Sequence, residues 1–122
     1  MNPRQLVLAA RKAADDKKAE DPVVIDLRKS SFIASYFLIV HGTSDRHTRT
    51  IADNVIGELA KKDSKVWHVE GMREGRWILL DFVDLIVHVF HHETRKFYDL
   101  ERLWGTPAKS APKRIKRSAR KN

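Results

Sequence analysis

The segment HGTSDRHTRTIADN at residues 41–54 places a glycine and two hydroxyl side chains between an apolar run and an amphipathic segment. A glycine turn at the start of a helix can bind phosphate, because the first N–H groups of the helix lack intrahelical partners. The segment has neither GxGxxG nor a lysine after a glycine run, so it is not a P-loop. Gly42 as a backbone pivot, with Thr43 and Ser44 as helix caps, explains the same residues. We favour the cap interpretation and keep phosphate binding as the alternative.

Three aspartates raise the alternative of a metal-dependent, nucleotidyltransferase-like enzyme. Asp26 ends an apolar segment, and Asp81 and Asp84 flank a short turn. Two-metal catalysis needs carboxylates that share Mg²⁺ ions about 3.5–4 Å apart, close to a turn that holds phosphate. The strand expected after the glycine turn carries a single acid, Glu70, in place of an acid-x-acid pair. The two parts of such a site therefore do not occur in the order that would bring them together.

Histidine and hydroxyl side chains offer two weaker possibilities. The segment HVFHHE at 88–93 contains three histidines, but HHETR lacks the HExxH spacing that places two imidazoles on one helical face. The chain has no cysteine to serve as a thiolate ligand or nucleophile. Ser44 and His47 are neighbours in sequence, and a helix cap accounts for them. We therefore expect no catalytic residue, no metal and no cofactor.

Hydrophobic periodicity predicts a mixture of helices and strands that positions these residues. Helices are expected at 3–18, 45–62 and about 92–104, where apolar residues recur at helical spacing. Strands are expected in five segments rich in β-branched and apolar residues: 23–27, 36–40, 65–70, 76–81 and 84–90. The fold class is therefore α/β in the order α-β-β-α-β-β-β-α, with a five-stranded mixed sheet and about three helices.

The connections between these elements predict part of the topology. Asp21-Pro22 is expected to break the first helix before the first strand. The links 71–75 and 82–83 are too short for a crossover, so the strands that they join should be antiparallel neighbours. The helix between 36–40 and 65–70 is long enough for those two strands to be parallel.

Alternation along the strands predicts one purely apolar face and one mixed face of the sheet. The mixed face carries Trp77 and Asp81 in the segment 76–81, and it carries His88 in the segment 84–90. Helices should cover the apolar face. The mixed face around Trp77 is typical of a partner interface, in which aromatic residues are enriched and ionic residues surround them. The alternative is that a loop of the same chain covers Trp77.

The formal net charge of +8 is concentrated at one end of the chain. Residues 109–122 hold seven Lys and Arg and no acid, which leaves the remainder near +1. We expect 1–106 to form one domain and 107–122 a disordered basic tail, which suits RNA without sequence preference or serves only solubility. The apolar runs are far shorter than the ~20 residues that span a bilayer, and the N-terminus lacks a signal-peptide pattern. A cytoplasmic protein without membrane contact is expected.

Several motifs together carry a resemblance to a known family. They are S-S-x-x-x-Y-F at 30–37, G-T-S-D-R-H at 42–47, Glu70-Gly71, W-I-L-L-D at 77–81, D-x-x-V-H-x-F at 84–90 and R-x-F-Y-D-L-E-x-L-W at 95–104. With these motifs, residues 3–105 resemble the ribosomal silencing factor family, also called Iojap-like. The resemblance implies an α/β fold similar to a nucleotidyltransferase core, without the catalytic carboxylate pattern of that core.

The resemblance also implies a function without catalysis. Members bind the large ribosomal subunit through ribosomal protein L-fourteen, block joining of the small subunit, and repress translation under nutrient limitation or in stationary phase. Free members are expected to be homodimers. The implied contact surface includes Glu70, Gly71 and Trp77, and nearness extends it to Met72, Arg73, Arg76 and Asp81. Non-specific contact with rRNA is expected from the tail residues Lys113, Arg114, Lys116, Arg117 and Arg120.

Overall fold

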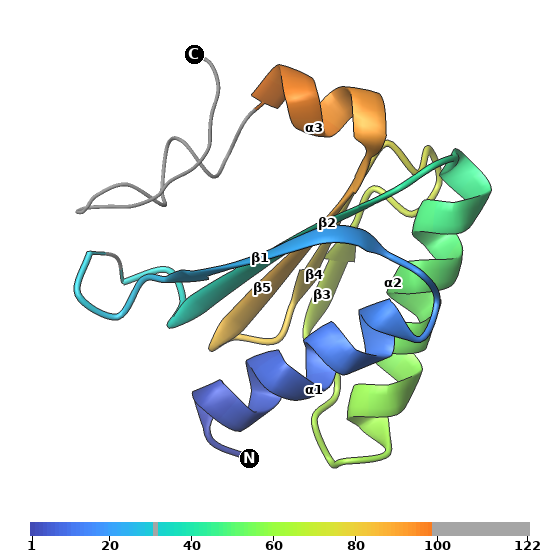
Figure 1. Ribbon diagram of the computed structural model, residues 1–122. Helices are drawn as coiled ribbons and strands as arrows, with labels where there is room; N and C mark the ends of the chain where they lie inside the picture. The colour runs from blue at the N-terminus through green and yellow to red at the C-terminus, as the bar shows by residue number, and fades with distance from the viewer. Residues whose placement is uncertain (31, 99–122) are drawn as a thin grey trace.

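The computed structural model describes residues 1–30 and 32–98 of the chain. Their helices and strands follow the expected order: α1 (Pro3–Asp15), β1 (Glu20–Asp26), β2 (Tyr36–Gly42), α2 (Asp45–Ala60), β3 (His68–Glu70), β4 (Trp77–Asp81), β5 (Leu85–His91) and α3 (His92–Tyr98). Helices α1 and α2 lie on one side of the sheet, and α3 continues from the end of β5 (Figure 1). The predicted α/β class with a five-stranded mixed sheet is confirmed. Residues 99–104 of the expected last helix, and the tail, lie outside the described residues.

The strands lie in the order β1-β2-β5-β4-β3, and among these described strands only β2 and β5 pair in parallel. The short links join antiparallel neighbours, β3 with β4 and β4 with β5, as predicted. Strands β2 and β3 run in the same direction but are not neighbours, because β5 and β4 lie between them. Residues 85–90 of β5 are all buried, so this strand is favoured at the centre of the sheet. The short, largely exposed β3 lies at the edge.

Side-chain caps start both long helices as the sequence predicts. The Asn2 side chain accepts from the Gln5 N–H at 2.8 Å, while the Gln5 side chain accepts from the Asn2 N–H at 3.1 Å. The Ser44 hydroxyl accepts from the His47 N–H at 3.0 Å. Each cap satisfies a backbone donor that has no partner within its helix.

The end of α1 differs from the prediction. The helix ends at Asp15, and Lys18 then adopts a positive φ of 62°. In this turn the Ala19 N–H donates to the Ala14 carbonyl at 3.1 Å, which satisfies a carbonyl left open at the helix end. The predicted break at 21–22 is therefore wrong, because these two residues lie within β1, where the pairing register shifts.

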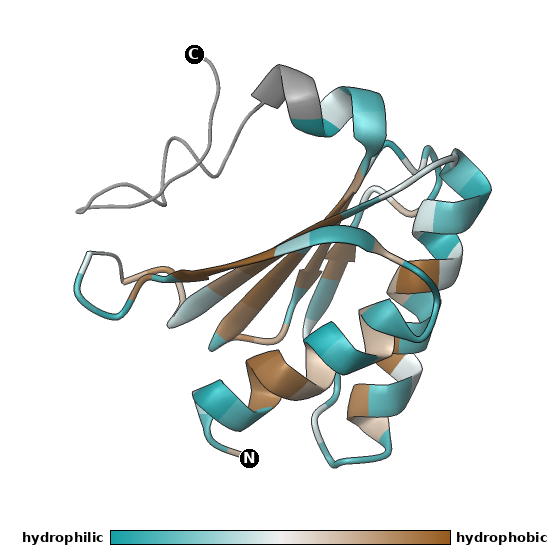
Figure 2. Ribbon diagram, in the orientation of Figure 1, coloured by the Kyte–Doolittle hydropathy of each residue, from teal (hydrophilic) through white to brown (hydrophobic). Residues whose placement is uncertain are grey.

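Two apolar clusters lie on the two faces of the sheet. The larger cluster, between the sheet and helices α1 and α2, includes Ile51, Val55 and Leu59 of α2 and Ile78 and Leu80 of β4. Most brown, apolar positions of both helices face the sheet, whereas Leu8 of α1 is exposed (Figure 2). The second cluster lies on the mixed face and consists of Ile25, Leu27, Phe37, Ile39, Ile86 and Phe90, with Trp77 and Leu79 packed against them. The predicted division of the sheet into an apolar and a mixed face is confirmed. None of the described helices is long and apolar enough to cross a membrane.

Candidate functional site

The strand register arranges the side chains of the mixed face in rows. Glu70 pairs with Leu79, which in turn pairs with His88, and Trp77 pairs with Phe90. Directly paired residues share a face of the sheet, and diagonal neighbours lie within reach of large side chains. Trp77 on β4 and His88 on β5 are such diagonal neighbours.

The indole of Trp77 is held at its polar edge and along its ring. Its Nε1–H donates to His88 Nδ1 at 3.1 Å. The ring centroids of Trp77 and Phe90 lie 5.0 Å apart, and Phe37 meets the His88 ring edge-on at 4.6 Å. Trp77 itself is half-buried. The mixed face therefore presents a tryptophan whose orientation is set by an aromatic cluster beneath it.

His88 is the buried polar member of that cluster. Its side chain is 4% exposed, and burial lowers its pKa from 6.5 to about 4. Since Nδ1 accepts from Trp77, the ring proton of the neutral imidazole is on Nε2. That Nε2 atom is buried without a hydrogen-bond partner in the described part of the chain. If a second proton bound to Nδ1, this atom could no longer accept the hydrogen bond from the Trp77 N–H.

We expect His88 to make the fold acid-sensitive, with a loss of about 2 kcal/mol in unfolding free energy between about pH 6.5 and 4.5. The pKa of His88 in the fold lies below its unfolded value of 6.5. The neutral ring therefore stabilises the fold fully above the unfolded pKa, and this stabilisation is lost as the pH falls toward about 4. Urea unfolding at the two pH values measures the loss. A His88→Phe variant should lack it, and an undiminished loss in that variant would assign the effect to other groups.

The β3–β4 hairpin brings Glu70 and Gly71 to the Trp77 end of β4. Glu70 is exposed, and its carboxylate lies 2.8 Å from His68 Nε2. Gly71 has a φ of 84°, and a Cβ added there would lie 2.0 Å from the Trp77 carbonyl oxygen. The Gly75 N–H donates to the Gly71 carbonyl at 2.9 Å and closes the loop. Only glycine at 71 lets the loop approach the Trp77 backbone this closely.

The remaining loop residues of the predicted surface face in different directions. Met72 is partly buried and packs against the helix-side core. Arg73 is exposed. Arg76 forms ion pairs with Glu93 at 3.4 Å and with Asp45 at 4.0 Å, which tie the hairpin to α3 and to the start of α2. The structure thus gives Met72 and Arg76 contacts within the fold, and their role toward a partner stays a prediction.

Asp81 lies at the other end of β4 from Trp77. The two side chains share a face but are four residues apart, which is ~13 Å along a strand. One carboxylate oxygen of Asp81 accepts from the Val83 N–H at 2.7 Å. Val83 has a φ of 76°, a strained conformation for a β-branched residue, and the bond supports that turn. The predicted surface is therefore divided into a hairpin group and this distant aspartate. The predicted rRNA-contacting residues of the tail lie outside the described residues.

The glycine turn before α2 is bonded within the fold. His47 Nδ1 accepts from the Thr43 N–H at 2.9 Å, and His47 Nε2–H donates to the Lys17 carbonyl at 2.7 Å. A Cβ at Gly42 would lie 3.0 Å from His47 Nδ1. The Thr48 hydroxyl lies 2.6 Å from the Gly75 carbonyl, so the hairpin packs against the first turn of α2. These contacts favour the cap interpretation over phosphate binding.

The acids of the enzyme alternative do not form a metal-binding group. Among residues 1–30 and 32–98, no three His, Asp or Glu side chains gather closely enough to hold a metal ion. Asp26 instead forms an ion pair with Arg28 at 2.6 Å, and this hydrogen bond holds the pKa of the Asp26 carboxyl below its usual value. Asp81 is engaged at the β4–β5 turn. The three-aspartate site needed for two-metal catalysis is not assembled by this fold.

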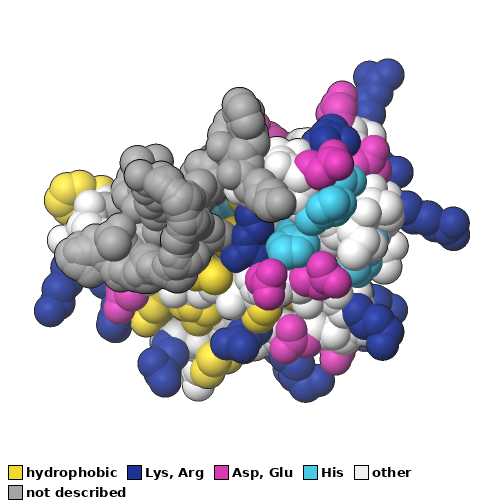
Figure 3. Space-filling model, turned by 45° about the horizontal axis from the view of Figure 1, so that its top comes forward, with side chains coloured by type: hydrophobic (Ala, Val, Ile, Leu, Met, Phe, Trp, Pro, Cys, Tyr) yellow, Lys and Arg dark blue, Asp and Glu magenta, His cyan; other side chains and the backbone are white. Residues whose placement is uncertain are grey.

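Three histidines lie at the C-terminal ends of β2 and β5, and one of them, His41, is bonded to charged neighbours. His41 Nε2 lies 3.0 Å from a Glu20 carboxylate oxygen, and Arg95 donates to His41 Nδ1 at 3.0 Å. The rings of His91 and His92 stack 4.5 Å apart. Figure 3 shows histidine, acidic and basic side chains gathered on this end of the molecule. Arg95 also donates to the Glu20 backbone carbonyl at 3.4 Å, so its hydrogen bonds fasten α3 to β1 and β2.

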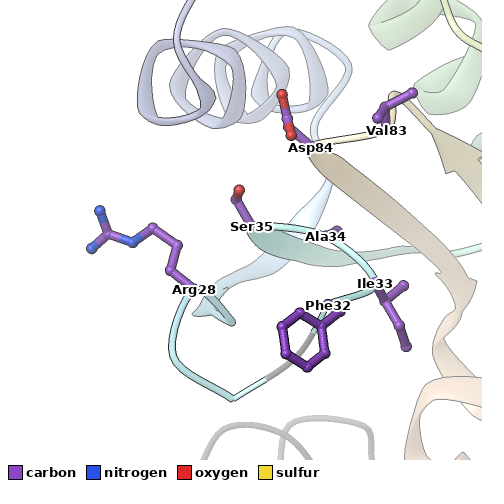
Figure 4. Close-up of a pocket in the computed structure, with 7 residues that line it drawn as sticks. All are labelled: Arg28, Phe32, Ile33, Ala34, Ser35, Val83 and Asp84. Carbon is purple, nitrogen blue, oxygen red and sulfur yellow. The ribbon is translucent and has the colours of Figure 1, made fainter.

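A cavity of about 270 Å³ lies at the opposite end of the sheet. It lies between the β1–β2 loop and the β4–β5 turn (Figure 4) and is lined by Arg28, Phe32, Ile33, Ala34, Ser35, Val83 and Asp84. The Ser35 N–H donates to the Asp84 carbonyl at 2.9 Å and joins its two sides. The cavity includes none of the predicted partner-binding residues, so it is separate from the surface around Trp77.

The prediction from sequence placed both Trp77 and His88 on the mixed face but missed the bond between them. Alternation assigns a side chain to a face, whereas the bond depends on how β4 and β5 are offset along their length. The motif D-x-x-V-H-x-F contains His88, but nothing in the motif indicates that this histidine bonds to Trp77. The clamp made by His47 was missed for the same reason, because Lys17 belongs to a different element.

Comparison with known proteins identifies a matching family and several similar proteins. Residues 1–122 match the family described as "Ribosomal silencing factor during starvation". Ribosomal silencing factor RsfS of Bacillus subtilis is 42% identical over 105 residues, which cover 86% of this chain and 89% of that protein. The mouse protein named "Mitochondrial assembly of ribosomal large subunit protein 1" is 30% identical over 91 residues, which cover 72% of this chain and 40% of that protein.

Two crystal structures share the fold. One, from Chromobacterium violaceum, superposes with a TM-score of 0.83 at 29% identity and covers 85% of this chain and 87% of its own. The other, from Bacillus halodurans, gives a TM-score of 0.76 at 37% identity and covers 83% of this chain and 94% of its own.

Proposed function

The chain belongs to the ribosomal silencing factor family, and on that premise we propose that it binds the large ribosomal subunit through ribosomal protein L-fourteen. Bound there, it blocks joining of the small subunit and represses translation in the cytoplasm when nutrients are scarce. The observation that best supports this surface is the indole of Trp77, held by His88 at 3.1 Å on the same face of the sheet as the exposed Glu70.

The mechanism requires that the protein binds one subunit and occupies the space that the other subunit would fill. It involves no chemical step. A folded domain of this size on the joining face of one subunit excludes the other subunit by steric overlap. Trp77 provides an aromatic anchor that is already oriented, so it loses little conformational freedom on binding. The carboxylates of Glu70 and Asp81 suit lysine and arginine side chains of a basic ribosomal protein. Tail residues such as Lys113 and Arg117 add non-specific attraction to rRNA phosphates.

The free protein is proposed to be a homodimer. If the dimer interface overlaps the surface around Trp77, the dimer has to dissociate before it can bind the ribosome. The rate of complex formation would then rise less than in proportion to the protein concentration, because the monomer fraction falls, and a kinetic binding experiment can measure this.

A subunit-joining assay tests the proposed function. Wild-type protein should reduce the formation of whole ribosomes from purified subunits, and Glu70→Lys should need at least tenfold more protein for the same effect, because it reverses a charge that faces a basic partner. Glu74→Lys is the matched control, since Glu74 is also exposed and lies in the same hairpin but is not among the residues of the predicted surface. Equal inhibition by wild-type and Glu70→Lys protein would contradict this docking surface.

Two further results would favour other functions. A variant ending at residue 108 should keep most of the inhibition at low salt. If it binds no subunits at all, the protein is instead an RNA-binding module that works through its tail. Mg²⁺-dependent nucleotide incorporation that is lost in Asp81→Asn would overturn the proposal of a function without catalysis.

A further inference from the structure

We infer that His88 is a positioning residue for the docking surface: its Nδ1 holds the Trp77 indole in the orientation in which the ring meets the partner. The inference rests on the proposed function, because it assigns a task to a residue beneath the proposed surface. It concerns a buried side chain that touches no partner and acts only through Trp77.

The location of His88 restricts the movement of its own ring. It lies on β5, the central strand of the sheet, and 4% of its side chain is exposed. On the same strand, the Phe90 ring lies parallel to it at 6.2 Å, and on β2 the Phe37 ring meets its edge at 4.6 Å. A buried imidazole on the central strand, with a phenyl edge 4.6 Å from its centre, has little room to follow a movement of the tryptophan. The bond therefore restrains Trp77 relative to the sheet.

The bond also limits what Trp77 can offer a partner. An indole has one polar hydrogen, on Nε1, and no acceptor. That hydrogen is directed at His88, inside the fold. Toward a partner the indole therefore offers carbon and no polar hydrogen, which suits an aliphatic chain or a cation and does not suit an acceptor such as a phosphate oxygen. Lysine and arginine side chains combine both favoured features, and Glu70, a diagonal neighbour of Trp77 on the same face, adds a negative charge that attracts them.

The plain alternative is that His88 only fills the core. A phenylalanine at 88 would fill nearly the same space and keep the ring packing, so this alternative predicts an unchanged Trp77. The positioning role predicts that the same substitution releases the indole N–H. His88→Phe therefore separates the two, and urea unfolding at neutral pH establishes that the variant is folded.

The first measurement uses the free protein with ¹⁵N-labelled tryptophan. The Trp77 indole resonance is the one that disappears in Trp77→Phe. In His88→Phe we expect this resonance to shift and its N–H to exchange with solvent at least tenfold faster, because the hydrogen bond is lost. An unchanged shift and exchange rate would overturn the inference, whatever the protein binds.

The second measurement is the affinity for purified large subunits. Trp77→Phe and His88→Phe should each weaken binding roughly fivefold, and the double variant should also weaken it roughly fivefold, since all three lose the same bond. Losses that multiply to roughly 25-fold in the double variant would overturn the inference. His88→Asn, which returns an acceptor near the Nδ1 position, should recover part of the affinity. Ile25→Val, a mild change in the same cluster on β1, should leave the affinity unchanged.

The two measurements distinguish a wrong docking surface from a wrong role for His88. If Trp77→Ala binds subunits as well as the wild type, the proposed docking surface is wrong, and so is the part of the inference that concerns the partner. The resonance in the free protein still decides whether His88 holds the indole. If the resonance is unchanged while Trp77→Ala abolishes binding, the docking surface stands and the role of His88 does not.

Discussion

Replacing Gly71 with alanine should lower the free energy of unfolding by about 3–4 kcal/mol. The residue has a φ of 84°, which costs any L-residue energy, and the new Cβ would lie 2.0 Å from the Trp77 carbonyl oxygen. The obstacle is backbone on a paired strand, so no side-chain rotation relieves it. The β3–β4 hairpin has to move away from β4, which weakens the edge of the sheet.

Urea unfolding of the purified variants measures this effect, and Gly57 provides the control. Gly57 lies in α2, where an added Cβ meets no atom within 4 Å. Gly57→Ala should therefore raise the free energy of unfolding by about 0.5–1 kcal/mol, since alanine favours helix over glycine. If both substitutions changed stability by the same amount, the close approach at Gly71 would not be the cause. Gly71→Ala should also bind large subunits more weakly, because the hairpin carries Glu70.

Replacing Trp77 with alanine should weaken binding to the large subunit about 100-fold, or about 2.7 kcal/mol. The substitution removes a large aromatic surface at the centre of the proposed interface, where such residues dominate binding energy. Sedimentation of the protein with purified subunits over a range of concentrations measures the affinity. Because Trp77 also packs against Phe90, unfolding curves have to establish that the variant is folded at the assay temperature.

Trp67 is the matched control for this experiment. It is 73% exposed and lies just before β3, two residues from Val69, which packs on the helix side of the sheet. Trp67→Ala removes the same side chain from outside the mixed face, so it should leave the affinity within about twofold of wild type. A loss as large as that of Trp77→Ala would place the docking surface elsewhere on the molecule.

The fold class and the two sheet faces were predictable because they depend on local patterns. Period-two alternation assigns Trp77 and Ile78 to opposite faces whatever the strand pairs with. Caps such as Asn2 and Ser44 bond to a backbone donor three residues ahead, so a short window of sequence contains both partners. Short links require antiparallel pairing for the same local reason. The absence of an acid-x-acid pair on the strand after the glycine turn was equally visible.

The strand order was not predictable from such windows. Helix α2 is long enough to return the chain beside β2, but the position next to β2 is taken by β5. The choice depends on which strand gains most from burial on both faces, and that is a comparison across the whole sheet. The end of α1 escaped prediction because Lys18, a residue without strong turn preference, adopts the positive φ.

The features of the candidate site also divide into those that follow from local patterns and those that depend on the packing of the whole sheet. The shared face of Trp77, Glu70 and His88 was predictable, because each position follows from alternation within its own strand. Two contacts became known only from the folded structure: the Trp77 N–H meets His88, and Met72 packs against the helix-side core. These contacts depend on the offset between strands, and that offset is set by the packing of the whole sheet and its helices.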